Sequence, residues 1–411
     1  MAGVKGAWLA AVVLAACDQR AQEVQIEADL KQTVQQMMPA VERATGLRFK
    51  QRPVVLRRTR AQVRDYVVHK FDDDLPPREL AGAQAAYRLF GLIPDTLDLR
   101  RSMIDLLTEQ VAGYFDPDSN ALYIPADNDP SQARLVVSHE LVHALQHQYL
   151  NLDSLVQLKR QNDRRSAAQA ILEGQATLAQ VVVLMPEQKI ESLPNLWELR
   201  GAVLGAGQEQ MKVFASAPLW LRETLIFPYL GGAEFVRWFE HQYPGKQPYG
   251  PLMPISTEQI LHPARYMAGD RPDGLAFTSS DAVRYEDGLG EFEIRLLFEQ
   301  FLHDDSIAVS SASGWDGDRY QVRAVAATRR TAKGDALVWY TLWDDAPASV
   351  RFAKTLERAW TKRRSAGTAV RRFEVKRLLI SGIPAVRLID APPGWAGWKR
   401  VPTIRVTRAG R

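Results

Sequence analysis

The chain has 411 residues, of which 46% are hydrophobic and 24% are charged. These values are ordinary for a folded protein of two or three domains, and they exclude disorder throughout. One cysteine excludes an internal disulfide and a cysteine-rich zinc module. The sequence has no phosphate-binding glycine loop, dinucleotide fingerprint or Gly-x-Ser-x-Gly elbow. No apolar run reaches the roughly 18 residues that a membrane-spanning helix needs.

The net charge of +4 is unevenly distributed along the chain. Residues 312–411 hold 21 basic and 8 acidic residues, a net of +13, which leaves 31 basic and 40 acidic residues elsewhere, a net of −9. A basic region is compatible with an anionic membrane surface or nucleic acid. Its arginines are scattered among apolar strands, however, which favours a solvated basic face. The densest group, Lys362–Arg364 with Arg371 and Arg372, is too interrupted for a nucleic-acid arm, so we expect no nucleic-acid partner.

The first residues have the pattern of a targeting signal. Ten apolar residues, 7–16, follow Lys5, a length that suits a signal-peptide core and is too short to span a bilayer. They end in Leu-Ala-Ala and are followed by Cys17, the only cysteine. This pattern resembles a bacterial lipoprotein signal with its lipobox. The resemblance implies cleavage before Cys17 and lipid attachment to its sulfur, with a plain secretory signal as the alternative.

A lipid on Cys17 would hold the mature chain at a membrane, because each buried methylene contributes about 0.8 kcal/mol. Asp18 follows the cysteine and is similar to the signal that retains enterobacterial lipoproteins at the inner membrane. The expected location is therefore the bacterial cell envelope, at the periplasmic face of the inner membrane. A lipidated Cys17 also leaves no free thiol, which fits an oxidising compartment.

Hydrophobic periodicity and turn signals predict a mostly helical region first. Two strands, 111–115 and 121–124, are joined by a turn at 116–120, and we expect an exposed loop at 72–77. Strong helices are predicted at 131–149 and 164–184. The other predicted helices are 24–41, 59–71, 79–90, 97–110, 220–241 with a break at Pro228, and 291–303.

From about residue 311 the pattern changes to strands that flank one helix. A Ser/Gly-rich stretch at 305–315 favours a domain boundary there. The predicted helix covers residues 347–362. The predicted strands are 320–326, 336–343, 373–380 and 385–389.

Residues 138–143, Ser-His-Glu-Leu-Val-His, lie in the middle of the predicted helix 131–149. Residues i and i+4 are neighbours on a helix, so His139 and His143 point the same way and can hold one zinc ion. Glu140 would reach toward a water on that ion. The alternative is a pair of histidines that pack or hydrogen-bond without a metal.

A catalytic zinc needs a third protein ligand and an open position. The long metzincin pattern is excluded, because Gln146 and Tyr149 replace its Gly and His. We choose Glu173, since an inward-facing Glu needs a partner. Gly174 beside it costs about 1 kcal/mol relative to Ala in a helix, which close approach to another backbone would justify. The alternative is a solvated Glu. Weaker ligand candidates are Asp153, Asp163 and Glu187, and His147 is too far along the axis, by about 6 Å, to share the ion.

The segments His-Glu-Leu-Val-His-Ala-Leu-Gln (139–146) and Leu-Glu-Gly-Gln-Ala-Thr (172–177) resemble the gluzincin group of zinc metallopeptidases, of the thermolysin type. They are most similar to a poorly characterised bacterial and archaeal branch. Gln175 stands where that branch usually has Asp, and His147 where it usually has an acidic residue. The resemblance extends over most of the chain after about residue 100. It includes residues 113–117, 227–231, 258–263 and 314–320.

The resemblance implies a zinc metalloendopeptidase in which Glu140 is the general base. Gluzincin-like enzymes use Tyr or His to stabilise the oxyanion, which suggests His262 and Tyr266, with Tyr229 as an equal rival and packing roles as the alternative. Strand 121–124 could be the edge to which an extended peptide adds.

The predicted fold class is α+β. It comprises a signal peptide (1–16), a mostly helical zincin-like metallopeptidase domain with a small sheet (17–310), and a smaller basic α+β domain (311–411). The expected function is zinc-dependent hydrolysis of peptide or protein substrates in the cell envelope. Two alternatives are a catalytically silent zinc protein that acts as a chaperone or assembly factor, and a binding module in residues 312–411. The oligomeric state stays open.

Overall fold

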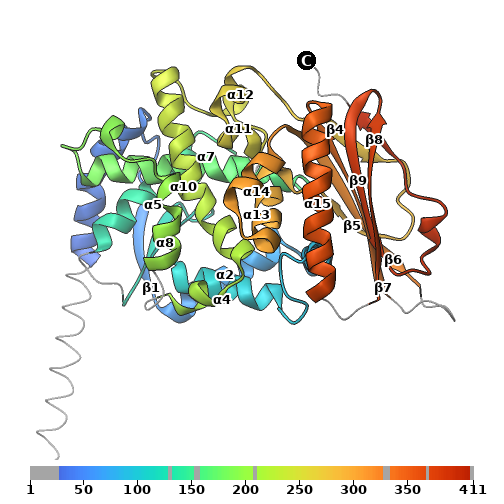
Figure 1. The fold of residues 1–411 in the computed structure, drawn as a ribbon. Helices are drawn as coiled ribbons and strands as arrows, with labels where there is room; N and C mark the ends of the chain where they lie inside the picture. Colours follow the sequence, from blue (N-terminus) through green and yellow to red (C-terminus); the bar gives the residue numbers. More distant parts are fainter. Residues whose placement is uncertain are drawn as a thin grey trace, which may run out of the picture. The chain divides into compact units, whose positions relative to one another are not determined.

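The computed structural model describes residues 27–127, 132–151, 158–206, 211–326, 334–366 and 370–407. The expected signal peptide and Cys17 lie outside these residues. The chain divides into two compact units. Figure 1 shows the helices and strands, coloured along the sequence. The first unit comprises the described parts of Met1–Tyr66, Gln110–Asn151 and Gln175–Leu193. The second unit comprises those of Val67–Glu109, Leu152–Gly174 and Pro194–Arg411.

The first unit combines helices with a three-stranded sheet of order β1-β3-β2. β3 (Ala121–Pro125) is parallel to β1 (Val54–Arg58) and antiparallel to β2 (Tyr114–Asp116). The predicted hairpin is therefore confirmed. The helical elements are residues 27–45, the start of α2 (Arg60–Asp74), α5 (Ala133–His147) and the end of α7 (Asn162–Leu184).

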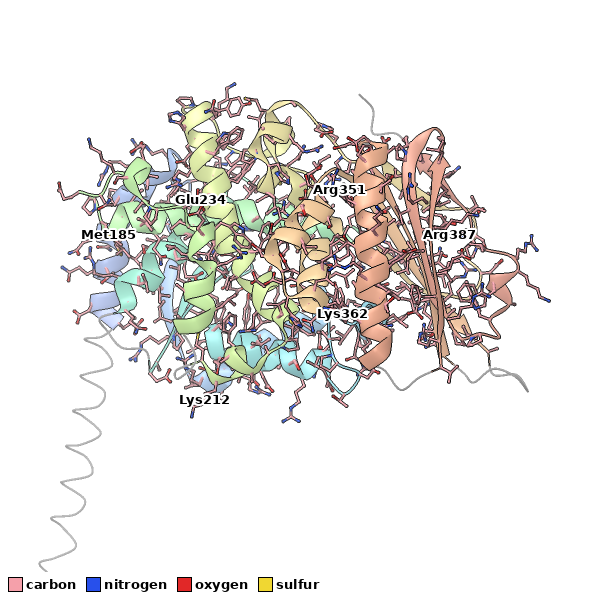
Figure 2. All side chains as sticks on the ribbon, viewed as in Figure 1. Met185, Lys212, Glu234, Arg351, Lys362 and Arg387 are labelled. Carbon is pink, nitrogen blue, oxygen red and sulfur yellow. The ribbon has the colours of Figure 1, made fainter. Side chains whose placement is uncertain are left out.

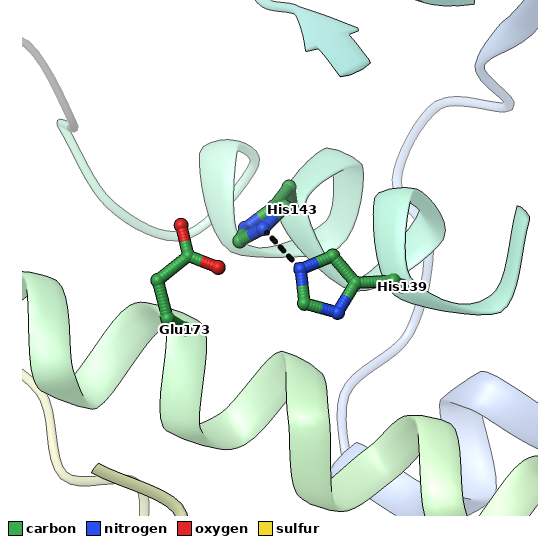
Figure 3. A group of neighbouring side chains, drawn as sticks. All are labelled: His139, His143 and Glu173. Carbon is green, nitrogen blue, oxygen red and sulfur yellow. Dashed lines mark hydrogen bonds between the residues drawn. The ribbon is translucent and has the colours of Figure 1, made fainter. Parts of the chain in front are cut away.

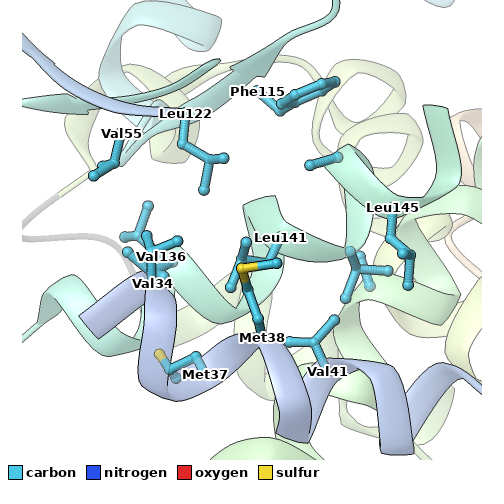
Figure 4. Close-up of a cluster of buried hydrophobic side chains, with 14 of the residues drawn as sticks. Val34, Met37, Met38, Val41, Val55, Phe115, Leu122, Val136, Leu141 and Leu145 are labelled. Carbon is cyan, nitrogen blue, oxygen red and sulfur yellow. The ribbon is translucent and has the colours of Figure 1, made fainter. Parts of the chain in front are cut away.

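The core of this unit surrounds one face of α5 (Figure 4). Leu141 and Leu145 of α5 pack with Met38 and Val41 of the first helix and with Leu122 of β3. Burial of each such side chain contributes about 1.5–3 kcal/mol. This packing fixes the rotation of α5 about its axis and leaves its opposite face for polar residues.

The second unit begins with helices. They are α3 (Pro77–Phe90), α4 (Leu99–Gln110), the first part of α7, α8 (Arg200–Ala206), α9 (Lys212–Ser216), α10 (Leu219–Gln242), α11 (Thr257–Leu261), α12 (Pro263–Met267), α13 (Gly290–Leu302) and α14 (Asp305–Ala312). The predicted break at Pro228 is wrong, because α10 continues through this residue. Pro removes a single backbone donor, and buried residues on both sides of Pro228 hold the helix together. The expected loop at Asp72–Asp74 is likewise the last turn of α2.

A five-stranded antiparallel sheet completes the second unit, in the order β5-β6-β7-β9-β8. Its strands are β5 (Val283–Asp287), β6 (Trp315–Val325), β7 (Gly334–Trp343), β8 (Arg372–Ile380) and β9 (Ile383–Ala391). On one face, Phe352 of α15 (Ala346–Ala366) packs on Trp339 and Trp343 of β7. On the other face lies a ribbon of β4 (Gly274–Phe277) and β10 (Ile404–Thr407).

The α+β prediction is confirmed, and the predicted strands of the basic region form most of this sheet. β5 comes from before the predicted boundary at residues 310 and 311 and pairs with β6. The boundary itself stays a prediction. Several basic residues of the region form ion pairs within it, including Arg387 with Glu374, and Arg363 and Arg371 with Asp390. Figure 2 labels Arg387, together with Arg351 and Lys362 of α15.

α7 is long and apolar enough to cross a membrane by length and composition. However, half of the most apolar 18-residue stretch of α7 is buried inside the protein. A core helix of a folded domain passes the same test, and this helix carries the predicted ligand Glu173 in its middle. We therefore treat α7 as a core helix.

Candidate metal centre

His139 and His143 lie one turn apart on the polar face of α5, as the sequence predicts. Their Nε2 atoms are 3.1 Å apart, and the ring planes are inclined by 78°. Two imidazole nitrogens on one tetrahedral zinc, each at about 2.0–2.1 Å, would be about 3.3 Å apart. The two rings therefore hold nearly the separation that a shared zinc ion requires.

Glu173 of α7 completes a group with these histidines (Figure 3). One ligand atom from each of the three residues lies within 4.8 Å of the others, and all three side chains are partly buried. The division between the units falls inside α7, directly after Gly174. α7 is one continuous helix across this division, and Glu173 lies in the part of it that belongs to the second unit.

Close packing around Gly174 explains the glycine beside the predicted ligand. A Cβ atom at Gly174 would overlap the backbone of Gly232 and Ala233 in α10, and a Cβ at Gly232 would overlap the carbonyl oxygen of Ala170. The two helices thus meet backbone to backbone, as the sequence analysis expects. This contact fixes the height and rotation of α7 at the residue next to Glu173.

A chain of buried amides orients His143. The Nδ1 of His143 lies 2.9 Å from Oε1 of Gln146, and Nε2 of Gln146 donates to Oε1 of Gln175 at 3.1 Å. An acceptor at Nδ1 keeps the proton on that nitrogen, so the Nε2 lone pair faces Glu173 and His139. Sequence reasoning named Gln146 and Gln175 only as departures from family patterns. The spacing of three residues between His143 and Gln146 would have indicated the contact.

Glu140 is 8% exposed and lies against strand β2. The backbone N–H of Phe115 donates to Oε2 of Glu140 at 2.9 Å. This hydrogen bond fixes one carboxylate oxygen and leaves the other for a water or a substrate. It also locates the outer edge of β2 beside Glu140.

The expectation that residues 121–124 form the edge strand is wrong. β3 is the central strand of its sheet, paired on both sides and fully buried. The β1 pairing was missed because a parallel partner 67 positions earlier in the chain leaves no local turn signal. Any peptide that extends this sheet beside Glu140 must add to β2.

A cavity of about 400 Å³ in the second unit has Glu173 in its wall. Tyr229 of α10 also lines it and is 41% exposed. A tyrosine hydroxyl in the same cavity as a predicted metal ligand is suited to donate to a reacting oxygen. This placement supports Tyr229 among the three predicted oxyanion donors.

His262 and Tyr266, the other predicted donors, lie in the second unit. The Nε2 of His262 is 2.9 Å from Oε1 of Glu291 and from Nη2 of Arg295. Burial alone would raise the pKa of Glu291, but Arg295 and His262 hold it below its usual value. The Tyr266 hydroxyl donates to the carbonyl of Leu252 at 2.8 Å. Neither residue is in the wall of the cavity that contains Glu173, and their catalytic role stays a prediction.

The weaker ligand candidates are placed as follows. The carboxylate of Asp163 accepts hydrogen bonds from the backbone and hydroxyl of Thr257, and burial raises its pKa to about 7. His147 packs its ring on Phe115, 5.8 Å between centroids. Asp153 lies outside the described residues, and Glu187 is exposed.

The donor set of the three clustered residues fits zinc. Two neutral imidazoles and one carboxylate are a known catalytic zinc set and leave the fourth position open. Hard cations such as magnesium and calcium prefer oxygen ligands. The residues present therefore fit zinc, which His139, His143 and Glu173 would hold.

Comparisons with known proteins agree with this assignment in broad terms. Residues 98–197 are similar to the IrrE N-terminal-like domain of the peptidase family M78, and this match contains His139, Glu140, His143 and Glu173. At a coarse level this similarity indicates a peptidase-like or hydrolase-like region, and the M78 family is usually associated with metal. Residues 281–378, from just before β5 into β8, match a domain of unknown function, DUF8575.

Two further comparisons add little. No curated protein matches the chain. One similar solved structure, from Chloroflexus aurantiacus, is described as "a putative hydrolase with a novel fold". The two proteins share 15% sequence identity, and the TM-score is 0.38. The match covers 59% of the present chain and 89% of the Chloroflexus chain. A likeness at that level carries no weight for fold or function.

Proposed function

We propose that the protein is a zinc-dependent metallopeptidase that hydrolyses internal peptide bonds. The observation that carries this proposal is the convergence of His139, His143 and Glu173 within 4.8 Å, with Glu140 on the same helix as the two histidines. A purely structural zinc site is usually closed by four protein ligands and has no need of Glu140. Here the set of three candidate ligands and the neighbouring carboxylate of Glu140 favour catalysis.

The proposed chemistry divides between the bound ion and the chain. When bound, zinc would supply a Lewis acid that lowers the pKa of water and polarises the scissile carbonyl. Glu140 takes a proton from the attacking water and later delivers it to the leaving amine. The hydrogen bond from Phe115 keeps one oxygen of Glu140 in place during both transfers.

Two other groups of the chain assist this reaction in the proposal. Gln146 holds the His143 ring in the tautomer that leaves Nε2 for the metal. Tyr229 donates to the developing oxyanion, since it shares a cavity wall with Glu173. His262 and Tyr266 stay as rival donors.

We propose further that the enzyme acts on peptides or proteins of the bacterial cell envelope. The lipoprotein-like signal at residues 1–17 supports this location. Replacing Cys17 by Ser is expected to move the protein from the membrane fraction to the soluble periplasmic fraction. Membrane retention of the Cys17→Ser variant would contradict lipid anchoring and leave the proposed chemistry untouched.

The decisive experiment compares the full chain with its Glu140→Gln variant. Both proteins, with zinc or with a chelator, are incubated with a diverse peptide mixture, and the products are identified by mass spectrometry. We expect cleavage by the wild type alone, abolished by the chelator. General-base catalysis contributes about 10²–10⁴-fold, so the variant should lose at least that factor.

Metal content, measured in parallel, separates the alternatives. The Glu140→Gln variant should retain one zinc per chain, because Glu140 is not among the proposed ligands. No cleavage by a zinc-loaded wild type would contradict the peptidase proposal and favour a chaperone or assembly factor. Equal cleavage by both proteins would exclude Glu140 as the base.

A further inference from the structure

The cavity that contains Glu173 extends along one face of α7. Asn162, Ser166, Gln169 and Glu173 line it at helical spacing. The rise of 1.5 Å per residue places Asn162 roughly 16 Å from Glu173 along the helix axis. An extended peptide covers about 3.3–3.6 Å per residue, so this length corresponds to between four and five residues.

The end of the cavity remote from Glu173 contains a buried carboxylate. Glu293 of α13 is 4% exposed, and its Oε1 accepts a hydrogen bond from Nε1 of Trp220 at 3.1 Å. Its Oε2 is buried and makes no hydrogen bond. Asn162 lies beside Glu293 and lowers its pKa, yet the Asn162 Nδ2 is also without a hydrogen bond of normal geometry. A buried acceptor of this kind needs a donor, because an unmet one is costly.

Aromatic rings surround this carboxylate. Tyr87, Trp220 and Tyr285 line the same cavity, and the rings of Tyr87 and Trp220 are 4.0 Å apart. Aromatic faces attract cations, and rings grouped around a carboxylate form the environment that binds ammonium groups. The remaining walls are apolar, from Phe71, Leu75 and Leu107 among others.

The local charge favours a cation at this end. Burial is the largest of the causes that raise the pKa of Glu293 to about 8, and the buried Asp287 and Asp318 also raise it. Arg165 is the cation in the wall, and it donates to Oδ1 of Asn162 at 3.0 Å. Burial raises the pKa of Asp287, and Arg165 opposes that rise. Among the described residues, no Lys or Arg forms an ion pair with Glu293.

We propose that the inner end of this cavity binds an ammonium group of the substrate, carried on a lysine side chain or at a peptide N-terminus. The apolar walls hold the stem that carries the group, and Glu293 accepts its hydrogen bond. The inference rests on the proposed function, because it assumes a peptide substrate whose scissile bond lies near Glu173. The cavity length then places the ammonium within roughly five residues of that bond.

Calorimetric titration of the zinc-loaded full chain tests this proposal without turnover, in the Glu140→Gln background. Nα-acetyl-lysine methylamide has a side-chain ammonium, and trialanine amide has an N-terminal ammonium, so the two probes represent the two sources. Acetyl-norleucine methylamide and acetyl-trialanine amide are the neutral counterparts. A charge-assisted hydrogen bond in a desolvated site should make at least one ammonium probe bind about tenfold tighter than its counterpart. The probe that shows the preference identifies the source.

The variant Glu293→Gln keeps the shape of the side chain and should reduce this preference to less than twofold. Glu299→Gln, on the same helix but outside the cavity wall, should leave it intact. In the Glu140→Gln background without the Glu293 change, the preference for the lysine probe should also rise between pH 6.5 and 8.5, because Glu293 ionises while the lysine ammonium stays charged. That measurement does not depend on the folding of the Glu293 variant.

Equal binding of ammonium and neutral probes, or a preference that survives Glu293→Gln, would overturn the inference. Cleavage of peptides without any ammonium preference would overturn it too and leave the peptidase proposal standing. Ammonium binding by a protein that cleaves nothing would have the opposite meaning, since the cavity assignment would hold and the peptidase proposal would fail.

Discussion

The ionisable groups of the two units lie in different environments. In the first unit, α5 packs its apolar face into a hydrocarbon core and keeps His139 and His143 on its partly buried face. In the second unit, carboxyl groups such as Glu258 and Glu293 lie inside the fold, where burial raises their pKa to about 9 and about 8. The first arrangement brings two imidazole nitrogens close enough to share a metal ion. The second raises the pKa of these acids and makes the stability of the unit depend on pH.

The most direct test of this difference between the units concerns Glu173, the ligand candidate on the helix that belongs to both of them. Glu173→Ala should weaken zinc binding at least about 100-fold, because second-shell changes alone cost 10–100-fold. Zinc competition with a chromophoric chelator measures this effect. The matched control is Glu187→Ala, an exposed acid close to the C-terminal end of the same helix. Equal affinities for the two variants would remove Glu173 from the proposed site.

A second test concerns the buried acids of the second unit. A carboxyl whose pKa is raised in the folded state keeps its proton while the unfolded chain has released it. Stability therefore falls by up to about 1.4 kcal/mol per pH unit between the unfolded pKa, about 4.3, and the folded pKa, and is constant above it. Glu293→Gln should remove this loss between about pH 4.3 and 8 and raise stability at pH 8 by a few kcal/mol.

Urea unfolding at pH 4, 6 and 8 measures the effect of Glu293→Gln. The variant should match the wild type at pH 4 and exceed it progressively at pH 6 and 8. Glu198→Gln, an exposed acid of the second unit, serves as control and should leave the pH dependence unchanged. A variant that is less stable than the wild type at pH 8 would mean that Glu293 is ionised and paired in the folded protein.

The helix contact beside Glu173 allows a third test, with two substitutions of opposite sign. Gly232→Ala places a methyl group against the carbonyl of Ala170 and should cost about 1–3 kcal/mol. Gly201→Ala, in α8, meets no atom within 4 Å and should stabilise the protein by up to about 1 kcal/mol. Both are measured by urea unfolding. A neutral result for Gly232→Ala would show that α7 and α10 can separate without cost.

The smallest expected effect sharpens the description of the metal centre. Gln146→Glu replaces a neutral acceptor at Nδ1 of His143 by an anionic one, which raises the basicity of the ring. Zinc affinity should rise about tenfold. The same chelator competition measures the zinc affinity. Gln148→Glu is the control, because the Gln148 side chain bonds the backbone of residues 50 and 51 and not His143. A fall in affinity would show that the Gln146–Gln175 bond matters more than the charge.

The sequence was most informative where function and local geometry coincide. The spacing of His139 and His143 predicted their shared direction, and Gly174 predicted a close helix contact, because both depend on neighbouring residues of one helix. The partner of Gly174, the parallel β1–β3 pairing and the position of β5 depend on residues far apart in the chain. Glu293 was not singled out, because a Glu in an amphipathic helix reads as solvated until the packing around it is known.

The continuity of α7 through the division between the units has a consequence for the unfolding of the protein. A helix propagates one hydrogen bond at a time, so fraying from either end must reach the turn of Glu173 before that ligand is lost. Amide hydrogen exchange along residues 162–184 would therefore record whether the two units open together or separately. A bound zinc would slow exchange most strongly in the middle of the helix. The unfolding of the chain would then be more cooperative with the ion than without it.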